Sequence, residues 1–286
     1  MTLPSFEIHC PATLAEAGGL MERLGDEAVI YAGGTELLLV MKLGFADYGH
    51  LIDVKGVADL ARLEADGDDL VIGGGVTHRE IERSPLVRER WPAFAAMAAG
   101  VANVRVRGAG TLGGNLAFAD PHSDPATFLL AAGARIDVWS AAGTRVVPMD
   151  DFVISAYQTA LEPGELIAAV RVPPLRPGSG VAHRKIAFHE RPAATVTCIV
   201  HVADGAVDDA RVAVGSVGLA PARLPGAEEA LVAGAAPDEL ERLAREGCAP
   251  TEDANGSVEY KRQIAGVLVR RAAAEAIAGA GGRAGG

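Results

Sequence analysis

The sequence predicts an α+β protein built from three units. Strand-like and helix-like runs interleave early in the chain, but without the long, regular βαβ alternation of a doubly wound sheet. The stretch PPLRPGSG at 173–180 is rich in proline and glycine and indicates a linker. Antiparallel strand patterns and then helices follow it. We therefore expect a short α/β unit (1–56), a mixed α+β unit (57–175) and a C-terminal antiparallel sheet with helices (176–286).

The first unit should alternate strands with helices. FEIHC indicates a short strand, and Thr13-Leu14-Ala15-Glu16 is a capping box that opens a helix ending near Leu24. AVIYAGG indicates a buried strand that ends in glycines. TELLLVMKLG is apolar enough to predict a short buried helix that stops at Gly44, and HLIDV indicates another buried strand.

In the second unit, ARLEADGDDLVIGGG predicts a hairpin that turns at Asp66-Gly67-Asp68. Thr77 to Glu80 form a second capping box. WPAFAAMAAGVAN indicates one helix that runs up to a glycine-rich segment, and DPATFLLAAG indicates a helix after it. ARIDVWSAAGTRVVPM predicts a hairpin that turns at Ala142-Gly143.

The third unit begins with antiparallel strand material in HRKIAFHE and in residues 194–219. Three helical stretches follow: PGAEEALVAG, PDELERLAREG and SVEYKRQIAGVLVRRAAAEAI. The tail AGAGGRAGG has nothing to bury and is expected to be disordered.

Composition and charge exclude several classes of protein. With a net charge of −11 the chain gains nothing from counterion release, so nucleic acid is a poor partner. No export signal or membrane-length apolar run is evident, which predicts a cytoplasmic protein. The three cysteines are far apart, with no CxxC pair, and no HExxH occurs. We therefore expect no metal ligands and no catalytic nucleophile or base in this chain.

Two glycine clusters carry the chemistry. Residues 32–37 (AGGTEL) lie between a predicted strand and helix, and residues 110–115 read GTLGGN. Glycine lets free backbone N–H groups approach an anion, and a helix N-terminus adds its dipole. Neither segment is a GxGxxG or a GxxxxGK[ST] motif. A single GG pair is usually a turn, but two such segments, one followed by Asp120 and Asp124, favour a phosphate-bearing cofactor.

The chain resembles the FAD-binding medium subunits of the molybdenum hydroxylases, the group that includes carbon monoxide dehydrogenase and xanthine dehydrogenase. AGGTEL followed by Met41-Lys42 matches the family's first motif, and VRGAGTLGGNLAFADPHSD (106–124) matches its second. VTHRE (76–80), TALEPGELI (159–167) and PARLPGAEEAL (221–231) also match, so the resemblance runs nearly end to end. It implies a VAO/PCMH-type FAD-binding fold and the small C-terminal domain of these flavoproteins.

The resemblance also implies the FAD-contacting residues. One wall of the pyrophosphate site would come from the first segment and the other from the second, with Asp124 on the ribityl or adenosine hydroxyls. For Asp120, a cofactor contact and a turn-capping role stay equally open, as do cofactor contact and solvent exposure for Lys185. The implied set is Ala32, Gly33, Gly34, Thr35, Glu36, Leu37, Gly110, Thr111, Gly113, Gly114, Asn115, Asp120, Asp124, Ile167 and Lys185.

Two positions depart from the family pattern. Gly108 stands where Asn is frequent, which removes a side-chain donor, and Thr195 stands where Asp is usual, which puts that residue's ion pair in doubt. His78 and Arg79 follow a predicted helix start and are expected to be structural or at the surface.

The resemblance implies an electron-transfer subunit. Electrons would pass from a molybdenum cofactor on a large subunit, through [2Fe–2S] clusters on a small subunit, to FAD on this chain and then to NAD, a quinone or O2. The complex is expected to be a dimer of heterotrimers. Two alternatives remain open at this point: a self-sufficient FAD-dependent oxidoreductase of the PCMH fold, and a non-catalytic nucleotide-binding assembly subunit.

Overall fold

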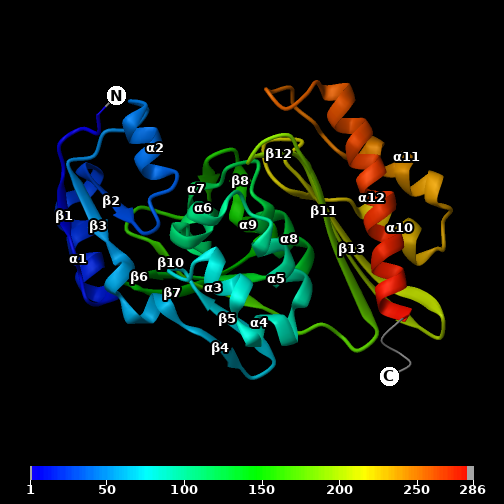
Figure 1. The fold of residues 1–286 in the computed structure, drawn as a ribbon. Helices are drawn as coiled ribbons and strands as arrows, with labels where there is room; N and C mark the ends of the chain where they lie inside the picture. Colours follow the sequence, from blue (N-terminus) through cyan, green and yellow to red (C-terminus); the bar gives the residue numbers. More distant parts are fainter. Residues whose placement is uncertain (1, 282–286) are drawn as a thin grey trace.

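The computed structural model describes residues 2–281 and contains three main sheets that follow one another along the molecule (Figure 1). The N-terminal sheet lies at one end, and the C-terminal sheet with its long helix lies at the other. The mixed α+β prediction is confirmed, and each predicted unit contains one of the three sheets. The boundaries at 56 and 175 stay predictions.

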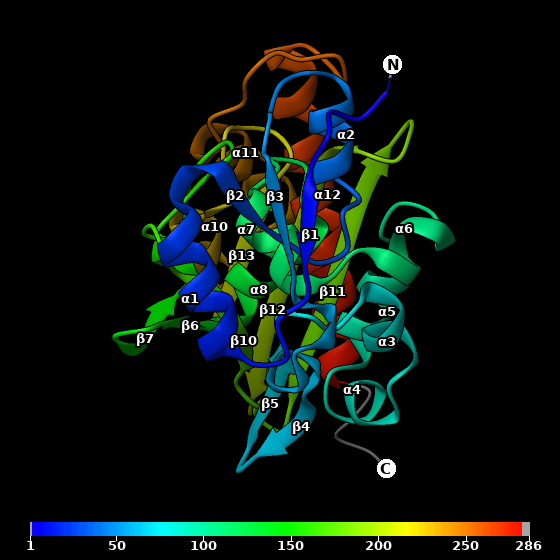
Figure 2. The ribbon, with the colours of Figure 1, turned by 90° about the vertical axis from the view of Figure 1, so that its left-hand side faces the viewer.

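The first sheet is parallel, in the order β1-β3-β2 (Figure 2). Thr13 caps α1 as predicted, because its hydroxyl accepts from the N–H of Glu16. The elements are β1 (Glu7–His9), α1 (Leu14–Leu24), β2 (Ala28–Tyr31), α2 (Leu37–Lys42) and β3 (His50–Asp53), with 3-10 turns η1 (Gly25–Glu27), η2 (Val54–Gly56) and η3 (Ala58–Ala61).

Helix α2 corrects one expectation, because it is not buried. Only Met41 is buried in it, and Leu39 is 42% exposed. Its apolar residues Leu37, Leu39 and Val40 line a cavity instead of filling a core. The apolar residues of this helix therefore face the cavity and do not pack into a hydrophobic core.

The second sheet is antiparallel, in the order β4-β5-β10-β6-β7. Its core centres on aromatic side chains: the ring of Phe128 stacks on Phe94 at 5.0 Å between centroids and meets Trp91 edge-on at 5.9 Å. Both predicted hairpins form. The strands are β4 (Leu63–Asp66), β5 (Asp69–Gly73), β6 (Arg135–Ser140), β7 (Gly143–Pro148) and β10 (Leu166–Val172), with a small sheet of β8 (Val153–Ser155) and β9 (Gln158–Thr159).

Helices cover this second sheet and carry the glycine-rich segment. The predicted capping box at Thr77 and Glu80 is present. The helices are α3 (His78–Arg83), α4 (Pro85–Arg90), α5 (Pro92–Ala99), α6 (Val104–Ala109), α7 (Leu112–Phe118), α8 (Asp124–Ala132) and α9 (Met149–Phe152).

The single helix predicted for residues 91–103 is wrong at its end. Helix α5 ends at Ala99, and Ala102 has a φ of 38°, which breaks the helical path. A new helix, α6, then starts at Asn103, whose side-chain oxygen accepts from the N–H groups of Arg105 and Val106. The hydrogen bonds of the Asn103 cap start a new helix here, although the apolar pattern of the sequence would allow the first helix to continue.

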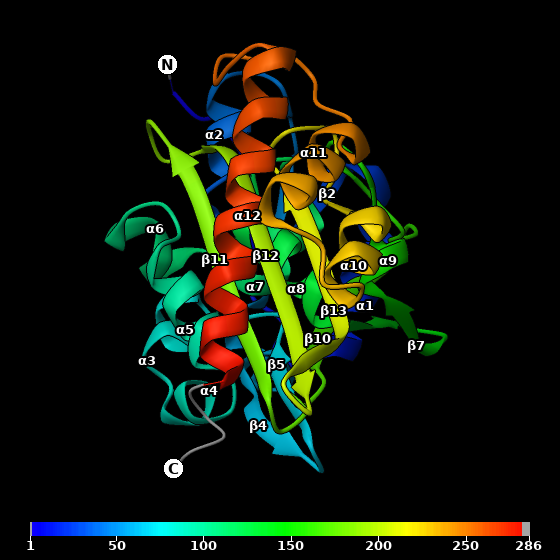
Figure 3. The same cartoon turned by 90° about the vertical axis from the view of Figure 1, so that its right-hand side faces the viewer.

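The third sheet is antiparallel, in the order β11-β12-β13-β14, and three helices pack on one face of it (Figure 3). Helix α12 runs along β11 and β12. The elements are β11 (Ser179–Ala187), β12 (Pro192–Ala203), β13 (Ala206–Gly215), β14 (Ala222–Arg223), α10 (Pro225–Val232), α11 (Pro237–Gly247) and α12 (Val258–Gly281).

The predicted disordered tail starts too early. Residues 278–281 belong to α12, and Ala280 is buried because Gly180 of β11 brings the helix and the strand close together. Residues 282–286 of that predicted tail lie outside the described residues. None of the helices in residues 2–281 has the length and apolar character needed to cross a membrane.

Candidate functional site

A cavity of about 640 Å³ lies where the first and second units meet, and Glu190 and Arg191 of the third unit also line it. This volume is within the range of about 300–1,000 Å³ that is typical of cofactor sites. All of the predicted site residues except Lys185 line it. The structure thus brings two glycine segments about 75 residues apart in the chain to one place, although contact with a cofactor stays a prediction.

The glycines of these segments do different work. A Cβ on Gly33 would stand 2.2 Å from the carbonyl oxygen of Ala109, and a Cβ on Gly113 would stand 2.6 Å from that of Gly74. These two glycines let backbone meet backbone. Gly34 adopts a φ of 69°, which turns the chain between β2 and α2. Only Gly114 has little around it, with the Thr111 hydroxyl at 2.9 Å from its hypothetical Cβ.

The free N–H groups come from the first segment. Within residues 2–281, no acceptor is found for the backbone N–H of Gly33, Gly34, Thr35 or Glu36. Successive unpaired N–H groups in a turn form a concavity that binds anions. The first segment is therefore the better cradle for a phosphate.

The second segment differs from the expectation of a second cradle of free N–H groups. Leu112 donates to the Val76 carbonyl and Gly113 to that of Gly74, both at 2.9 Å. Gly114 donates to the Thr111 hydroxyl at 3.1 Å, which caps α7. Because these donors are already paired, the segment offers the cavity the Asn115 side chain and the space beside Gly114.

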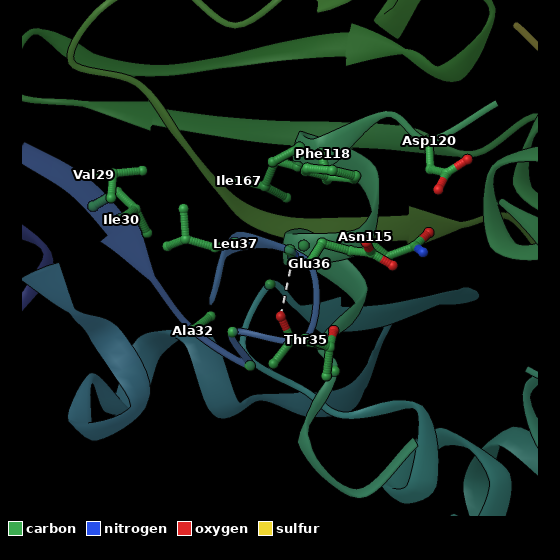
Figure 4. Close-up of a pocket in the computed structure, with 18 of the residues that line it drawn as sticks. Val29, Ile30, Ala32, Thr35, Glu36, Leu37, Asn115, Phe118, Asp120 and Ile167 are labelled. Carbon is green, nitrogen blue, oxygen red and sulfur yellow. Dashed lines mark hydrogen bonds between the residues drawn. The ribbon is translucent and has the colours of Figure 1, made fainter. Parts of the chain in front are cut away.

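One end of the cavity is apolar and the other is polar. Figure 4 shows Val29, Ile30 and Leu37 grouped at one end, and Asn115 and Asp120 at the other. Ile167 also lines the cavity and is 6% exposed. The cavity therefore offers a ligand both apolar walls and polar side chains.

Asp120 caps its turn, which is one of the two roles that the sequence left open, while its contact with a cofactor stays a prediction. Its Oδ1 accepts from the N–H of His122 at 2.9 Å, and its Oδ2 accepts from the Arg191 Nε at 2.7 Å. Burial alone would raise the pKa of Asp120, but the hydrogen bonds from His122 and Arg191 lower it to about 2. Asp120 also lines the cavity, so the turn and the site share this carboxylate.

Asp120 belongs to a chain of alternating charges that connects all three units. Arg191 also donates to Glu36 at 2.8 Å. On the other side, the His122 ring contacts Asp120 at 3.0 Å and Asp253 at 2.9 Å. Burial raises the pKa of Glu36, opposed by Arg191. From the cavity to helix α12, the series of paired charged side chains is Glu36, Arg191, Asp120, His122, Asp253 and Lys261.

Asp124 is 4% exposed, and Lys185 forms an ion pair with it but does not line the cavity. The Lys185 ammonium lies 2.5 Å from Asp124 Oδ2 and donates to the Gly100 carbonyl at 2.7 Å. Lys185 borders a second cavity of about 570 Å³ between α5, β11 and α12. Lys185 therefore contacts a residue that lines the cavity and does not line it itself, and its contact with the cofactor stays a prediction.

His78 is a cavity residue that the sequence did not identify as one. It is buried, at 3% exposure, and it lines the cavity, while Arg79 is half-buried. Burial lowers the pKa of His78 to about 4, so the ring is neutral near pH 7. Within residues 2–281 its Nδ1 has no hydrogen-bond partner, and neither does Asp124 Oδ1. Asp124 Oδ1 lies 3.7 Å from His183 Nε2, whereas the unpaired Nδ1 of His78, a residue that lines the cavity, favours a ligand that pairs with it.

Thr195, which replaces the usual Asp, makes no ion pair. It is fully buried, and its hydroxyl lies 3.0 Å from that of Thr127. The Thr127 hydroxyl also lies 3.2 Å from the Ser123 carbonyl oxygen, to which it can donate. Thr195 therefore joins β12 to α8 by a neutral hydrogen bond.

These features fit FAD. The free N–H groups at Gly33 to Glu36 suit its diphosphate, the apolar wall suits its ring systems, and buried Asp124 and His78 offer partners to its hydroxyl groups. The fold and the cavity together define a flavoprotein of the oxidoreductase class.

Comparison with known proteins agrees. Residues 4–175 match the FAD binding domain in molybdopterin dehydrogenase, and residues 183–276 match the CO dehydrogenase flavoprotein C-terminal domain. The chain therefore belongs to the family of FAD-binding subunits of the molybdopterin dehydrogenases, as its sequence motifs predicted. It contains their FAD-binding domain and is a subunit of an oxidoreductase.

The relatives span the whole chain. The carbon monoxide dehydrogenase medium chain of Hydrogenophaga pseudoflava is 34% identical over 95% of this chain and 97% of its own. The nicotine 6-hydroxylase medium subunit of Paenarthrobacter nicotinovorans is 33% identical over 96% and 99%. A carbon monoxide dehydrogenase structure from Hydrogenophaga pseudoflava matches with a TM-score of 0.94 at 34% identity, covering 97% of this chain and 99% of that one.

Proposed function

We propose that this chain holds FAD as the electron-transfer station of a molybdenum-containing hydroxylase or dehydrogenase. When bound, FAD can take up electrons from a one-electron donor and pass them on as a pair. The chain's own residues bind and orient it: Gly33 to Glu36 would hold the diphosphate, and Asp124 a hydroxyl group. The observation that carries the proposal is the four free N–H groups beside a cavity with an apolar wall.

The electron donor and the site of hydroxylation would lie on partner chains. Among residues 2–281, the three cysteines are dispersed, one exposed and two buried, so the sulfur ligands of an iron–sulfur cluster are not assembled here. The relatives are named as medium chains or subunits, which favours a large subunit with the molybdenum cofactor and a small subunit with [2Fe–2S] clusters. A dimer of such heterotrimers is the assembly that we propose.

The first experiment measures cofactor content. The purified chain should be yellow, and denaturation should release about one FAD per chain. An FAD-free chain that cannot be reconstituted with FAD would overturn the proposal and favour the non-catalytic nucleotide-binding assembly subunit.

The second experiment separates an electron-transfer subunit from a self-sufficient enzyme. The flavin of the isolated chain should be reduced by dithionite but not by carbon monoxide, xanthine or nicotine. In the complex purified with its native partners, the flavin should be reduced by the substrate of the large subunit. Substrate-driven reduction in the isolated chain would contradict the proposal. Reoxidation of the reduced complex by NAD, a quinone or O2 then identifies the acceptor.

A further inference from the structure

Three metal-ligating side chains meet on the first sheet, away from the cavity. Glu7 and His9 are two residues apart on β1, so their side chains leave the same face of the strand. His50 starts β3, the neighbouring parallel strand, and is the register partner of Glu7. Parallel pairing thus places a carboxylate and two imidazoles together, although 41 residues separate His9 from His50.

The distances between their ligand atoms suit one small cation. His9 Nε2 lies 3.1 Å from His50 Nδ1, and Glu7 Oε2 lies 3.6 Å from that same nitrogen. One ligand atom from each residue lies within 4.8 Å of the others. Zinc bonds of about 2.0–2.1 Å at tetrahedral angles place neighbouring ligand atoms about 3.3 Å apart. The two measured separations lie on either side of that value.

We propose that Glu7, His9 and His50 bind one Zn²⁺ ion, with the fourth coordination position open to water. Two imidazole nitrogens and one carboxylate oxygen form a donor set that zinc accepts readily. The site is reachable, because the side chain of His50 is 22% exposed and that of Glu7 is 74% exposed.

The ion would fasten the first strand to the molecule. Strand β1 has only three residues and pairs with β3 alone. A shared ion adds two side-chain attachments from β1 to β3. None of the three residues lines the cofactor cavity, so zinc binding is independent of the proposed FAD function.

The test is calorimetric titration of ZnCl2 into the full-length, FAD-loaded chain after treatment with a chelator. We expect one saturable zinc site per chain. The variants His9→Ala and His50→Ala should each lose it, and Glu7→Gln should bind more weakly. Two controls, His189→Ala and Cys10→Ser, remove an exposed imidazole elsewhere and the thiol next to His9, and both should bind like the parent.

A spectroscopic arm tests the geometry. Cobalt(II) at the same position should give the intense visible absorption of four-coordinate cobalt, and zinc should displace it. Unchanged FAD content in the histidine variants shows that they are folded. Three results would each overturn the proposal. They are no saturable zinc binding in the parent chain, a zinc affinity in both histidine variants equal to that of the parent, and loss of zinc binding in Cys10→Ser alone.

Discussion

Gly33 and Ala109 approach so closely that no side chain fits between them: a Cβ on Gly33 would stand 2.2 Å from the Ala109 carbonyl oxygen. This contact joins the first glycine segment to helix α6, directly before the second segment. The shape of the cavity therefore depends on the absence of a side chain at Gly33.

Replacing Gly33 should separate the two segments. We expect Gly33→Ala to lower the free energy of unfolding by about 1–3 kcal/mol, as overpacking does, and to reduce FAD retention. Thermal unfolding and the FAD released per chain measure both effects. The matched control is Gly19→Ala in α1, where a Cβ would meet nothing within 4 Å and should stabilise the helix. Parent-like stability and FAD content in Gly33→Ala would contradict the close contact.

Gly114 should behave differently, because it lines the cavity and a Cβ there would meet no backbone atom outside its own helix within 4 Å, only the Thr111 hydroxyl at 2.9 Å. We expect Gly114→Val to abolish FAD retention while the chain stays folded, since the side chain would fill space that the cofactor needs. Circular dichroism and FAD content test this. Full FAD occupancy in the variant would remove Gly114 from the site.

Gly108 offers a stabilising change. It lies inside α6, and a Cβ there would meet nothing within 4 Å. Because glycine inside a helix is less favourable than alanine, Gly108→Ala should raise the free energy of unfolding by about 0.5–1 kcal/mol. Denaturant titration measures it, and FAD content should not change. A loss of stability would show that this position needs backbone freedom.

His122 should make stability depend on pH. Burial would lower its pKa, but the hydrogen bonds to Asp120 and Asp253 raise it above 6.5. A raised histidine pKa stabilises the fold below pH 6.5, and this contribution is lost as pH rises through the raised value. The melting temperature of the parent should therefore fall between pH 6 and pH 9 by more than that of His122→Gln. Identical pH profiles would show that the charge chain does not couple to folding.

Lys185 should act through Asp124. Lys185→Met leaves a buried carboxylate without its cation, so the free energy of unfolding should fall. In the Asp124→Asn background the same change should cost less, and a double-mutant cycle should give a coupling of about 0.5–3 kcal/mol. Additive effects on stability would place Lys185 outside this pair. A loss of FAD on Lys185→Met that persists in the Asp124→Asn background would instead indicate direct cofactor contact.

The sequence alone determined the mixed α+β fold class, the family and the two glycine segments that line part of the cavity, because local patterns carry that information. Capping residues such as Thr13 and Thr77 mark helix starts, and the two glycine motifs are specific in order and composition. The end of α5 was missed, because the Asn103 cap competes with apolar periodicity.

Only the tertiary structure decided what the side chains at these positions do. It paired Asp120 with Arg191 and Lys185 with Asp124, turned His78 into a cavity residue, and occupied the N–H groups of Leu112 to Gly114. It also placed His50 beside His9. Each of these contacts either joins residues far apart in the chain or depends on which hydrogen-bond donors find acceptors. Sheet register and helix packing determine the long-range contacts and the pairing of donors, and no short stretch of sequence contains that information.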